Sequence, residues 1–261
     1  MSVIDQYLQK CQQLIEAVEK QKDQLQTAAQ WFARTIIAGR MVHVFGSGHS
    51  RIMAEEMWPR YGSFPGFNPI VELSLTFHNL VVGANGQRQA MFLENVAGLA
   101  ERILRNFSLT KEDSALVVSS SGCNVVPIEI AQIFQEKGIK VVVLVSLAHL
   151  EKSTSKSANG VKLTDYADLI LDTGAPVGDA SVQIPGLEAP VSPTSTVGGA
   201  IIINCLKAEI AKLLTEAAMP PIVLTSAAIV GAQRATDLFE SAYDDHAHRL
   251  AKLYQDVGLE N

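Results

Sequence analysis

The chain has 261 residues, 48% of them hydrophobic and 18% charged, with a formal net charge of −6 and a pI near 5.5. This composition is typical of a globular protein with a sizeable core, and the negative charge gives no electrostatic support for a nucleic-acid partner. No run approaches the ~18 consecutive apolar residues of a membrane span, and the polar first residues lack the layout of a signal peptide, so we expect no membrane partner.

Residues 3–38 have the pattern of one long helix. Apolar side chains recur there at steps of three and four residues, as one helical face requires: Ile4, Leu8, Cys11, Leu14, Ile15 and Val18. The pattern breaks at residues 21–24, resumes at Leu25 and ends at Gly39. We expect this helix to contribute to a homodimer or homotetramer.

From Met41 onwards, short apolar runs alternate with helical segments. The expected strands are Met41–Phe45, Ile70–Leu75, Ser114–Ser119, Lys140–Ser146, Asp168–Asp172 and Ile222–Ser226. The expected helices begin near Ser50 or span 88–106, 125–137, 194–215 and 231–256. Apolar strands separated by helices indicate an α/β fold with a parallel sheet covered on both faces.

The chain shows no internal repeat, low-complexity segment or linker. We therefore expect a single domain over residues 1–261. Its expected parts are an N-terminal helical arm (1–39), an αβα core (40–218) and a C-terminal strand and helix extension (219–261).

The turn after the first strand is rich in glycine and hydroxyl groups, with Gly46, Ser47, Gly48, His49 and Ser50 in succession. Glycines let the backbone approach a ligand closely, and the start of a helix offers free N–H groups to an anion. The same pattern also fits a tight strand-to-helix turn capped by Ser50. By itself it is a weak signal for phosphate binding.

The turn after the third strand has the same pattern of glycine and hydroxyl groups. Ser119, Ser121, Gly122 and Asn124 lie just before a helix, while Ser120 is expected to face away because neighbouring side chains at a strand end alternate. A third hydroxyl cluster, Thr194, Ser195 and Thr196, opens a later helix. Because the carboxyl ends of parallel strands meet at one sheet edge, three such turns predict a phosphate site without a basic patch.

The three cysteines, Cys11, Cys123 and Cys205, are widely spaced and not grouped with histidines. This usage argues against a disulfide framework and a zinc site, and it predicts a reducing, cytoplasmic location. Asp172 and Asp179 close one strand, but nothing else completes an oxygen cage, so we expect no metal site.

These motifs resemble the paired serine loops of SIS (sugar isomerase) domains. The likeness is greatest to bacterial sugar isomerase-like proteins described only as containing this domain, and more distant to sedoheptulose-7-phosphate isomerase and N-acetylmuramic acid 6-phosphate etherase. It is carried by the stretches 46–60, 68–78, 119–131, 172–180, 193–199 and 220–226, and it runs from about residue 3 to about residue 230.

The resemblance implies an SIS-type three-layer αβα sandwich with a five-stranded parallel sheet. It further implies that the ligand is a small phosphorylated sugar and that no cofactor or metal is needed. On this basis the phosphate is assigned to Ser47, Ser50, Ser119, Ser121 and Asn124. Residues 194–196 are expected to lie behind them.

Aldose–ketose isomerisation through an enediol needs an acid and a base near the sugar carbons. Our candidates are Glu56, Glu72 and His78, with Glu94 and His246 as further possibilities. The distant relatives are expected to use a glutamate ten residues beyond Ser50, where this chain has Arg60. Their mechanism therefore does not transfer directly.

Three functions stay open at this stage. The first is a cofactor-free sugar-phosphate isomerase. The second is an etherase-like lyase or an amino-sugar-phosphate deaminase. The third is a regulator that senses a phosphosugar without turnover.

Overall fold

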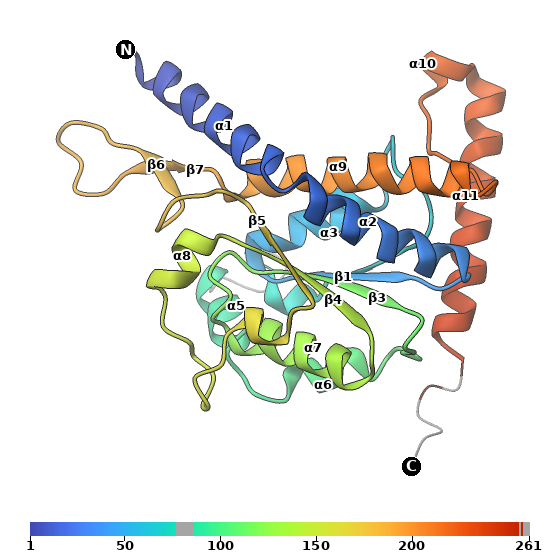
Figure 1. Cartoon of the computed structure of the whole chain (residues 1–261), viewed down its shortest axis with the longest axis horizontal. Helices are drawn as coiled ribbons and strands as arrows, with labels where there is room; N and C mark the ends of the chain where they lie inside the picture. The colour runs from blue at the N-terminus through green and yellow to red at the C-terminus, as the bar shows by residue number, and fades with distance from the viewer. Residues whose placement is uncertain (77–85, 256, 258–261) are drawn as a thin grey trace.

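The computed structural model describes residues 1–76, 86–255 and 257. Five parallel strands form one sheet in the order β2-β1-β3-β4-β5 (Figure 1). Their bounds are β1 Val42–Gly46, β2 Phe67–Ile70, β3 Ser114–Val118, β4 Lys140–Val145 and β5 Leu169–Asp172. The α/β fold with helices on both faces of a parallel sheet is therefore confirmed.

The helices form a layer on each side of the sheet (Figure 1). One layer holds α1 Val3–Glu19, α2 Lys22–Ile37, α3 Ile52–Met57 and α9 Ser195–Glu216, and the other holds α5 Gln87–Leu93, α6 Leu99–Leu104 and α7 Val125–Glu136. The remaining helices are α8 Leu147–Lys152, α10 Ala227–Val230 and α11 Ala232–Leu253. Among the residues described, no helix has the length and apolar character needed to cross a membrane.

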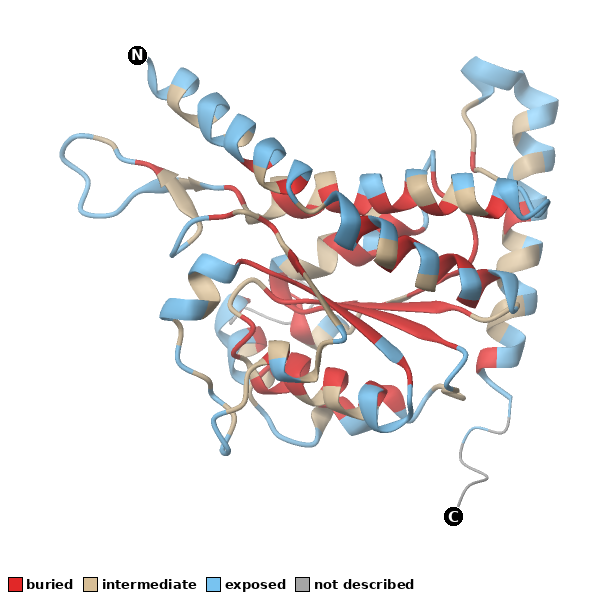
Figure 2. Ribbon diagram, viewed as in Figure 1, coloured by how far each residue is buried: buried red, intermediate tan, exposed pale blue. Residues whose placement is uncertain are grey.

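Strand alternation divides the core into two parts. Val42 and Val44 of β1 pack with the layer of α2, α3 and α9, whereas Phe45 packs with the layer of α6 and α7. Strands β1 and β3 are buried throughout, and β4 is buried except for Lys140 at its start (Figure 2). A sheet buried on both faces needs apolar side chains at nearly every position, which explains the continuous apolar runs in the sequence.

The expected long helix over residues 3–38 is wrong, because the chain turns at Lys20 and Gln21 between α1 and α2. The Gln21 side-chain amide donates to the carbonyl oxygens of Ala17 and Asp172, and its oxygen accepts the Asp172 N–H at 2.7 Å. These hydrogen bonds between Gln21 and the end of β5 stabilise the turn between α1 and α2. The exposed apolar residues of α1 include Ile4 and Leu8, and the expected homodimer or homotetramer stays a prediction.

Three other expected elements differ from the structure. The second strand, expected over 70–75, lies earlier at 67–70, and Leu73–Leu75 forms a single 3-10 turn (η2). The helix expected over 88–106 is split into α5 and α6 by a turn at Gly98, whose φ is +82°. Residues 222–226 join no strand ladder, although Leu224 pairs with the backbone of residues 62 and 63.

Several short elements were not expected from the sequence. The helix α8 follows β4, and a small antiparallel pair, β6 Ala180–Val182 with β7 Val191–Pro193, projects beside α1 (Figure 1). The pair connects β5 to α9. It therefore helps to place the start of α9 against the main sheet.

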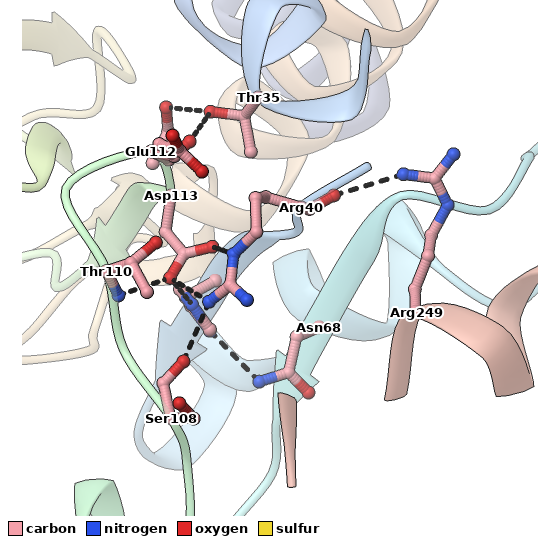
Figure 3. Close-up of polar contacts among 10 residues, drawn as sticks. Thr35, Arg40, Asn68, Ser108, Thr110, Glu112, Asp113 and Arg249 are labelled. Carbon is pink, nitrogen blue, oxygen red and sulfur yellow. Dashed lines mark hydrogen bonds and ion pairs between the residues drawn. The ribbon is translucent and has the colours of Figure 1, made fainter. Parts of the chain in front are cut away.

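A buried ionic network ties the amino ends of β1 and β3 together. The Arg40 guanidinium donates to both carboxylate oxygens of Asp113, at 2.9 and 2.8 Å, and to the Ser108 carbonyl oxygen (Figure 3). The Nε2 atom of the buried His43 lies 3.5 Å from Asp113 Oδ2, and its Nδ1 atom lies 3.0 Å from the Asn68 amide nitrogen. The network lies at the end of the sheet opposite to the carboxyl ends of the strands.

Candidate active site

A cavity of about 330 Å³ lies beyond the carboxyl ends of β1, β3, β4 and β5. This is where ligands bind in open parallel sheets. The structure brings together most of the side chains expected to bind substrate, namely Ser47, His49, Ser50, Ser119, Ser121, Asn124, Ser195 and Thr196. Ser120, which we expected to face away, lines the cavity as well.

The other expected substrate-binding residues shape the walls. A Cβ on Gly46 would lie 2.4 Å from the Ser50 carbonyl oxygen, so only glycine permits this tight first loop. Gly48 and Gly122 have positive φ angles in their turns. Thr194 is fully buried, and its hydroxyl group contacts the Asp179 carbonyl oxygen and Ser181 instead of the cavity.

Glu94 is a carboxylate that lines this cavity and contacts Ser47 of the first loop. It follows α5, and its carbonyl oxygen accepts the Val126 N–H at 2.9 Å, which joins the end of α5 to the start of α7. Its side chain accepts the Ser47 hydroxyl at 2.7 Å. The residue is only 7% exposed.

Burial raises the pKa of Glu94, and this effect outweighs the opposing influence of the Ser47 hydroxyl, Lys156 and the Asn124 amide. A buried carboxylate is more basic than a solvated one because its charged form has lost water. A carboxylate of this kind in a cavity is a candidate general base.

Asp179, for which the sequence predicts no metal-binding role, is a second carboxylate that lines the cavity. Its side chain accepts the N–H groups of Thr194 and Ser195 at 2.9 and 2.7 Å, and the Ser195 hydroxyl at 2.6 Å. The start of α9 is therefore already occupied by an anionic cap. The Ser195 hydroxyl proton is used as well, so this end of the cavity is poorly suited to a phosphate.

The loop 119–124 has the opposite character. The Ser119 and Ser121 Oγ atoms accept the N–H groups of Gly122 and Cys123, so their own hydroxyl protons stay available to a ligand. Within the described chain, the N–H groups of residues 120, 121 and 124 donate to no protein acceptor. Successive free N–H groups with hydroxyl donors form an anion-binding concavity.

Glu56, expected to be catalytic, is held by side chains that do not line the described cavity. Its carboxylate accepts the Asn204 amide at 2.8 Å and pairs with Arg60, and it lies 3.6 Å from the Lys207 ammonium nitrogen. Burial would raise the pKa of Glu56, but these partners together lower it. Among the residues described, Glu56 does not line the cavity, because its partners on α9 hold it at the α3–α9 contact.

Glu72 and His78 complete the expected catalytic set. The Glu72 side chain caps the η2 turn by accepting the N–H and hydroxyl groups of Ser74, and it is absent from the described lining of the cavity. His78 lies outside the described residues. Neither residue is brought together with the serine loops by the part of the chain that the structure describes.

His246, the other further candidate, and Cys123 of the second serine loop are both partly enclosed by the fold. His246 packs against Trp58 at 5.2 Å between ring centroids, and burial lowers its pKa. Burial also raises the pKa of the Cys123 thiol, against the influence of Lys162 and Lys156. A thiol of raised pKa is a poor nucleophile, so Cys123 fits a small loop residue.

The start of α9 must approach β5 closely for the cavity to form. A Cβ on Gly198 would lie 2.2 Å from the Thr173 carbonyl oxygen, whereas one on Gly199 would meet the Met53 sulfur at 2.6 Å. We expect Gly198→Ala to lower the free energy of unfolding by about 1–3 kcal/mol, because a rigid backbone must move. Urea unfolding measures this change.

Gly199→Ala is the matched control for that variant. Met53 is a flexible side chain that can rotate away, and alanine is favoured over glycine within a helix. We expect the control to change stability by less than half as much. Equal losses in the two variants would contradict the close contact between Gly198 and Thr173.

Solved structures share this architecture. A phosphoheptose isomerase from Francisella tularensis superposes with a TM-score of 0.52 at 15% identity, over 81% of this chain and 100% of that chain. Phosphoheptose isomerase GmhA from Neisseria gonorrhoeae gives a TM-score of 0.51 at 14% identity, over 80% and 97%. At this level of identity the likeness shows a common fold.

Sequence relatives cover almost the full chain. A UPF0309 protein of Halalkalibacterium halodurans is 33% identical over 230 residues, which are 88% of this chain and 93% of the relative. A UPF0309 protein of Geobacillus kaustophilus is 32% identical over 255 residues, 97% and 95% of the two chains. Residues 6–146 match the SIS domain family. The chain thus belongs to the SIS domain family, and within it to the UPF0309 proteins.

Proposed function

We propose that the protein binds a phosphorylated sugar in this cavity and interconverts its aldose and ketose forms, with Glu94 as the base. The observation that carries this proposal is the buried carboxylate of Glu94, of raised pKa, in the same 330 Å³ cavity as an anion-binding loop. Membership of the SIS domain family and the fold shared with phosphoheptose isomerases support it.

The phosphate group is assigned to the loop 119–124. That loop offers the hydroxyl protons of Ser119 and Ser121 together with free backbone N–H groups. The Ser47 and Ser195 hydroxyls are committed to the carboxylates of Glu94 and Asp179, which would repel a phosphate beside them. Of the three hydroxyl clusters expected to bind phosphate, we therefore propose the loop 119–124 as the main phosphate-binding site.

The isomerisation step needs one carbon-bound proton to move. In the aldose, the Glu94 carboxylate removes the proton on C2, the C–H electron pair forms the C1–C2 double bond, and the carbonyl electron pair moves to O1. The proton then returns from Glu94 to C1 while the O2 proton passes to O1, directly or through water, and the product is the ketose. The Ser47 hydroxyl orients the carboxylate by donating to Oε2.

The decisive experiment incubates the protein in deuterated water with a panel of aldose, ketose and amino-sugar phosphates, each paired with its unphosphorylated sugar. Thermal unfolding reports binding, and NMR reports deuterium at C1 or C2. An isomerase incorporates deuterium and forms the second isomer. Stabilisation without exchange would overturn the isomerase and favour a sensor, while exchange followed by elimination or loss of the amine would favour a lyase or deaminase.

Phosphate recognition by the loop 119–124 gives a separate prediction. We expect Ser121→Ala to weaken binding of the phosphosugar about tenfold or more, because a hydrogen bond to a charged group contributes roughly 1.5–3 kcal/mol. Titration calorimetry measures the change. Ser226→Ala, at the cap of α10 and outside the cavity lining, is the control, and equal affinities of wild type and Ser121→Ala would contradict the assignment.

A further inference from the structure

His149 lines the same cavity as Glu94, from the opposite side of the anion-binding loop. It belongs to α8, which follows β4, whereas Ser47 and the Glu94 carboxylate that it holds lie at the end of β1. Strand β3 lies between β1 and β4 in the sheet. Two strand spacings span about 10 Å, so a sugar phosphate held on the loop after β3 lies between the two side chains.

The ring of His149 is held in one orientation. Its Nδ1 atom accepts the Gly178 N–H at 2.8 Å, and its backbone N–H donates to Ser146 Oγ at 3.2 Å. The Ser146 hydroxyl in turn donates to the Ala175 carbonyl oxygen at 2.7 Å. Both the ring and the start of α8 are thus fastened to the loop after β5.

The bond to Gly178 also selects the tautomer. A neutral imidazole has one nitrogen that accepts and one that donates, and here Nδ1 is the acceptor. The ring proton therefore sits on Nε2. His149 offers the cavity a fixed, uncharged N–H donor, and the described lining of the cavity includes no lysine or arginine.

Removal of a carbon-bound proton beside a carbonyl group places negative charge on the carbonyl oxygen. A fixed donor aimed at that oxygen lowers the barrier more than it strengthens substrate binding, because the charge develops only during the reaction. A neutral imidazole can play this electrophilic part opposite a glutamate base. Resting on the proposed function, we propose that His149 is the catalytic residue that stabilises the enediolate oxygen through Nε2–H.

Proton and electrons balance in this step. The proton on the carbon passes to the Glu94 carboxylate, the C–H electron pair forms the carbon–carbon double bond, and the carbonyl electron pair moves onto the oxygen that accepts the hydrogen bond from Nε2. His149 keeps its proton. No oxidant, reductant or further reactant is needed.

Two substitutions of His149 distinguish the role of Nδ1 as an acceptor from the role of Nε2 as a donor. His149→Asn can retain an acceptor for the Gly178 N–H but has no donor at the position of Nε2. His149→Gln reaches that position with an amide N–H. The measurements are deuterium exchange into the phosphosugar found for the wild type, affinity for that substrate, and affinity for a hydroxamate analogue of its enediolate.

We expect His149→Asn to slow deuterium exchange by a factor on the order of 10²–10³ and to weaken binding of the hydroxamate by a similar factor. The affinity for the substrate should change by less than about threefold. We expect His149→Gln to restore part of both losses. Unchanged exchange in His149→Asn, or equal weakening of substrate and hydroxamate in both variants, would overturn the role of His149. A wild type that exchanges no sugar phosphate would instead overturn the proposed function.

Discussion

Replacing Glu94 by glutamine is expected to slow deuterium exchange about 10²–10⁴-fold while the phosphosugar still binds. Glutamine has the same shape and can still accept the Ser47 hydroxyl, but it cannot take a proton from carbon. Loss of the base therefore acts on the chemical step alone. Exchange rates by NMR and affinity by calorimetry, measured on the same preparation, separate the two effects.

Glu56→Gln is the matched control for this variant. The same substitution is made on a carboxylate that lies outside the described cavity lining and pairs with Asn204, Arg60 and Lys207. We expect its exchange rate to stay close to that of the wild type. A larger loss in Glu56→Gln than in Glu94→Gln would reverse the assignment of the base.

The pH dependence of exchange follows from the same residue. Only the carboxylate form of Glu94 accepts a proton, and burial raises its pKa above the ordinary value of 4.5. The exchange rate should therefore fall as the pH drops through this raised pKa, at a higher pH than a solvated carboxylate would require. A rate that holds down to pH 4.5 would contradict Glu94 as the base.

The sequence patterns locate the sheet well because buried parallel strands need continuous apolar runs. Four of the six expected strands overlap their observed positions closely, and the serine loops at the ends of β1 and β3 meet in one cavity. Such features depend on local composition and on the geometry of a parallel sheet. They can be predicted without knowing any long-range contact.

The position of Glu94 depends on contacts between distant segments. In a continuous helix over 88–106 it is one polar residue among several. Only the turn at Gly98 and the bond from the Val126 N–H bring its side chain to Ser47. The Asn95 and Gly98 pair within an apolar helical pattern is the one local signal that indicates the break.

Two expected site residues are absent from the described cavity lining, and distant contacts again decide their positions. Glu56 is one turn beyond the first serine loop, but Asn204 and Lys207, about 150 residues later, hold its carboxylate at α9. Thr194 follows the hydroxyl pattern of its neighbours, yet its side chain is buried against Asp179 and Ser181. Side-chain direction at a helix start is decided by these partners, which the local sequence does not contain.

Removal of the Asp113 carboxylate is expected to have the largest effect on stability. Asp113→Ala leaves Arg40 and the fully buried His43 without their shared anion, and breaking a buried pair costs about 3–5 kcal/mol. We expect a loss of about 3 kcal/mol, because the Ser108 carbonyl oxygen still accepts from Arg40. Urea unfolding measures it, and Glu209→Ala, which breaks the surface pair with Lys212, should change stability by less than about 1 kcal/mol.

Acid unfolding tests the same network by another route. Burial would raise the pKa of Asp113, but the nearby His43 and the hydrogen bonds from Arg40 hold it at about 2, below the ordinary value of 3.8. A carboxylate whose pKa is lower in the folded state stabilises the fold fully above pH 3.8. This contribution to the free energy of unfolding, roughly 2 kcal/mol, is lost as the pH falls from 3.8 towards 2. Asp113→Asn should lack this component, and a wild-type stability that is flat between pH 4 and 2 would contradict it.

The Asp113 and Glu94 variants together separate folding from chemistry. Asp113 precedes β3, at the amino end of the sheet, while the cavity lies beyond the carboxyl ends of the strands. Asp113→Ala should therefore reduce the folded fraction but leave the exchange rate per folded molecule near that of the wild type. Glu94→Gln should do the reverse, because it removes a proton acceptor and keeps the packing. In a contrary outcome, each variant would lose exchange activity in proportion to its loss of folding stability. The loss in Glu94→Gln would then come from unfolding, and the assignment of the base to Glu94 would fail.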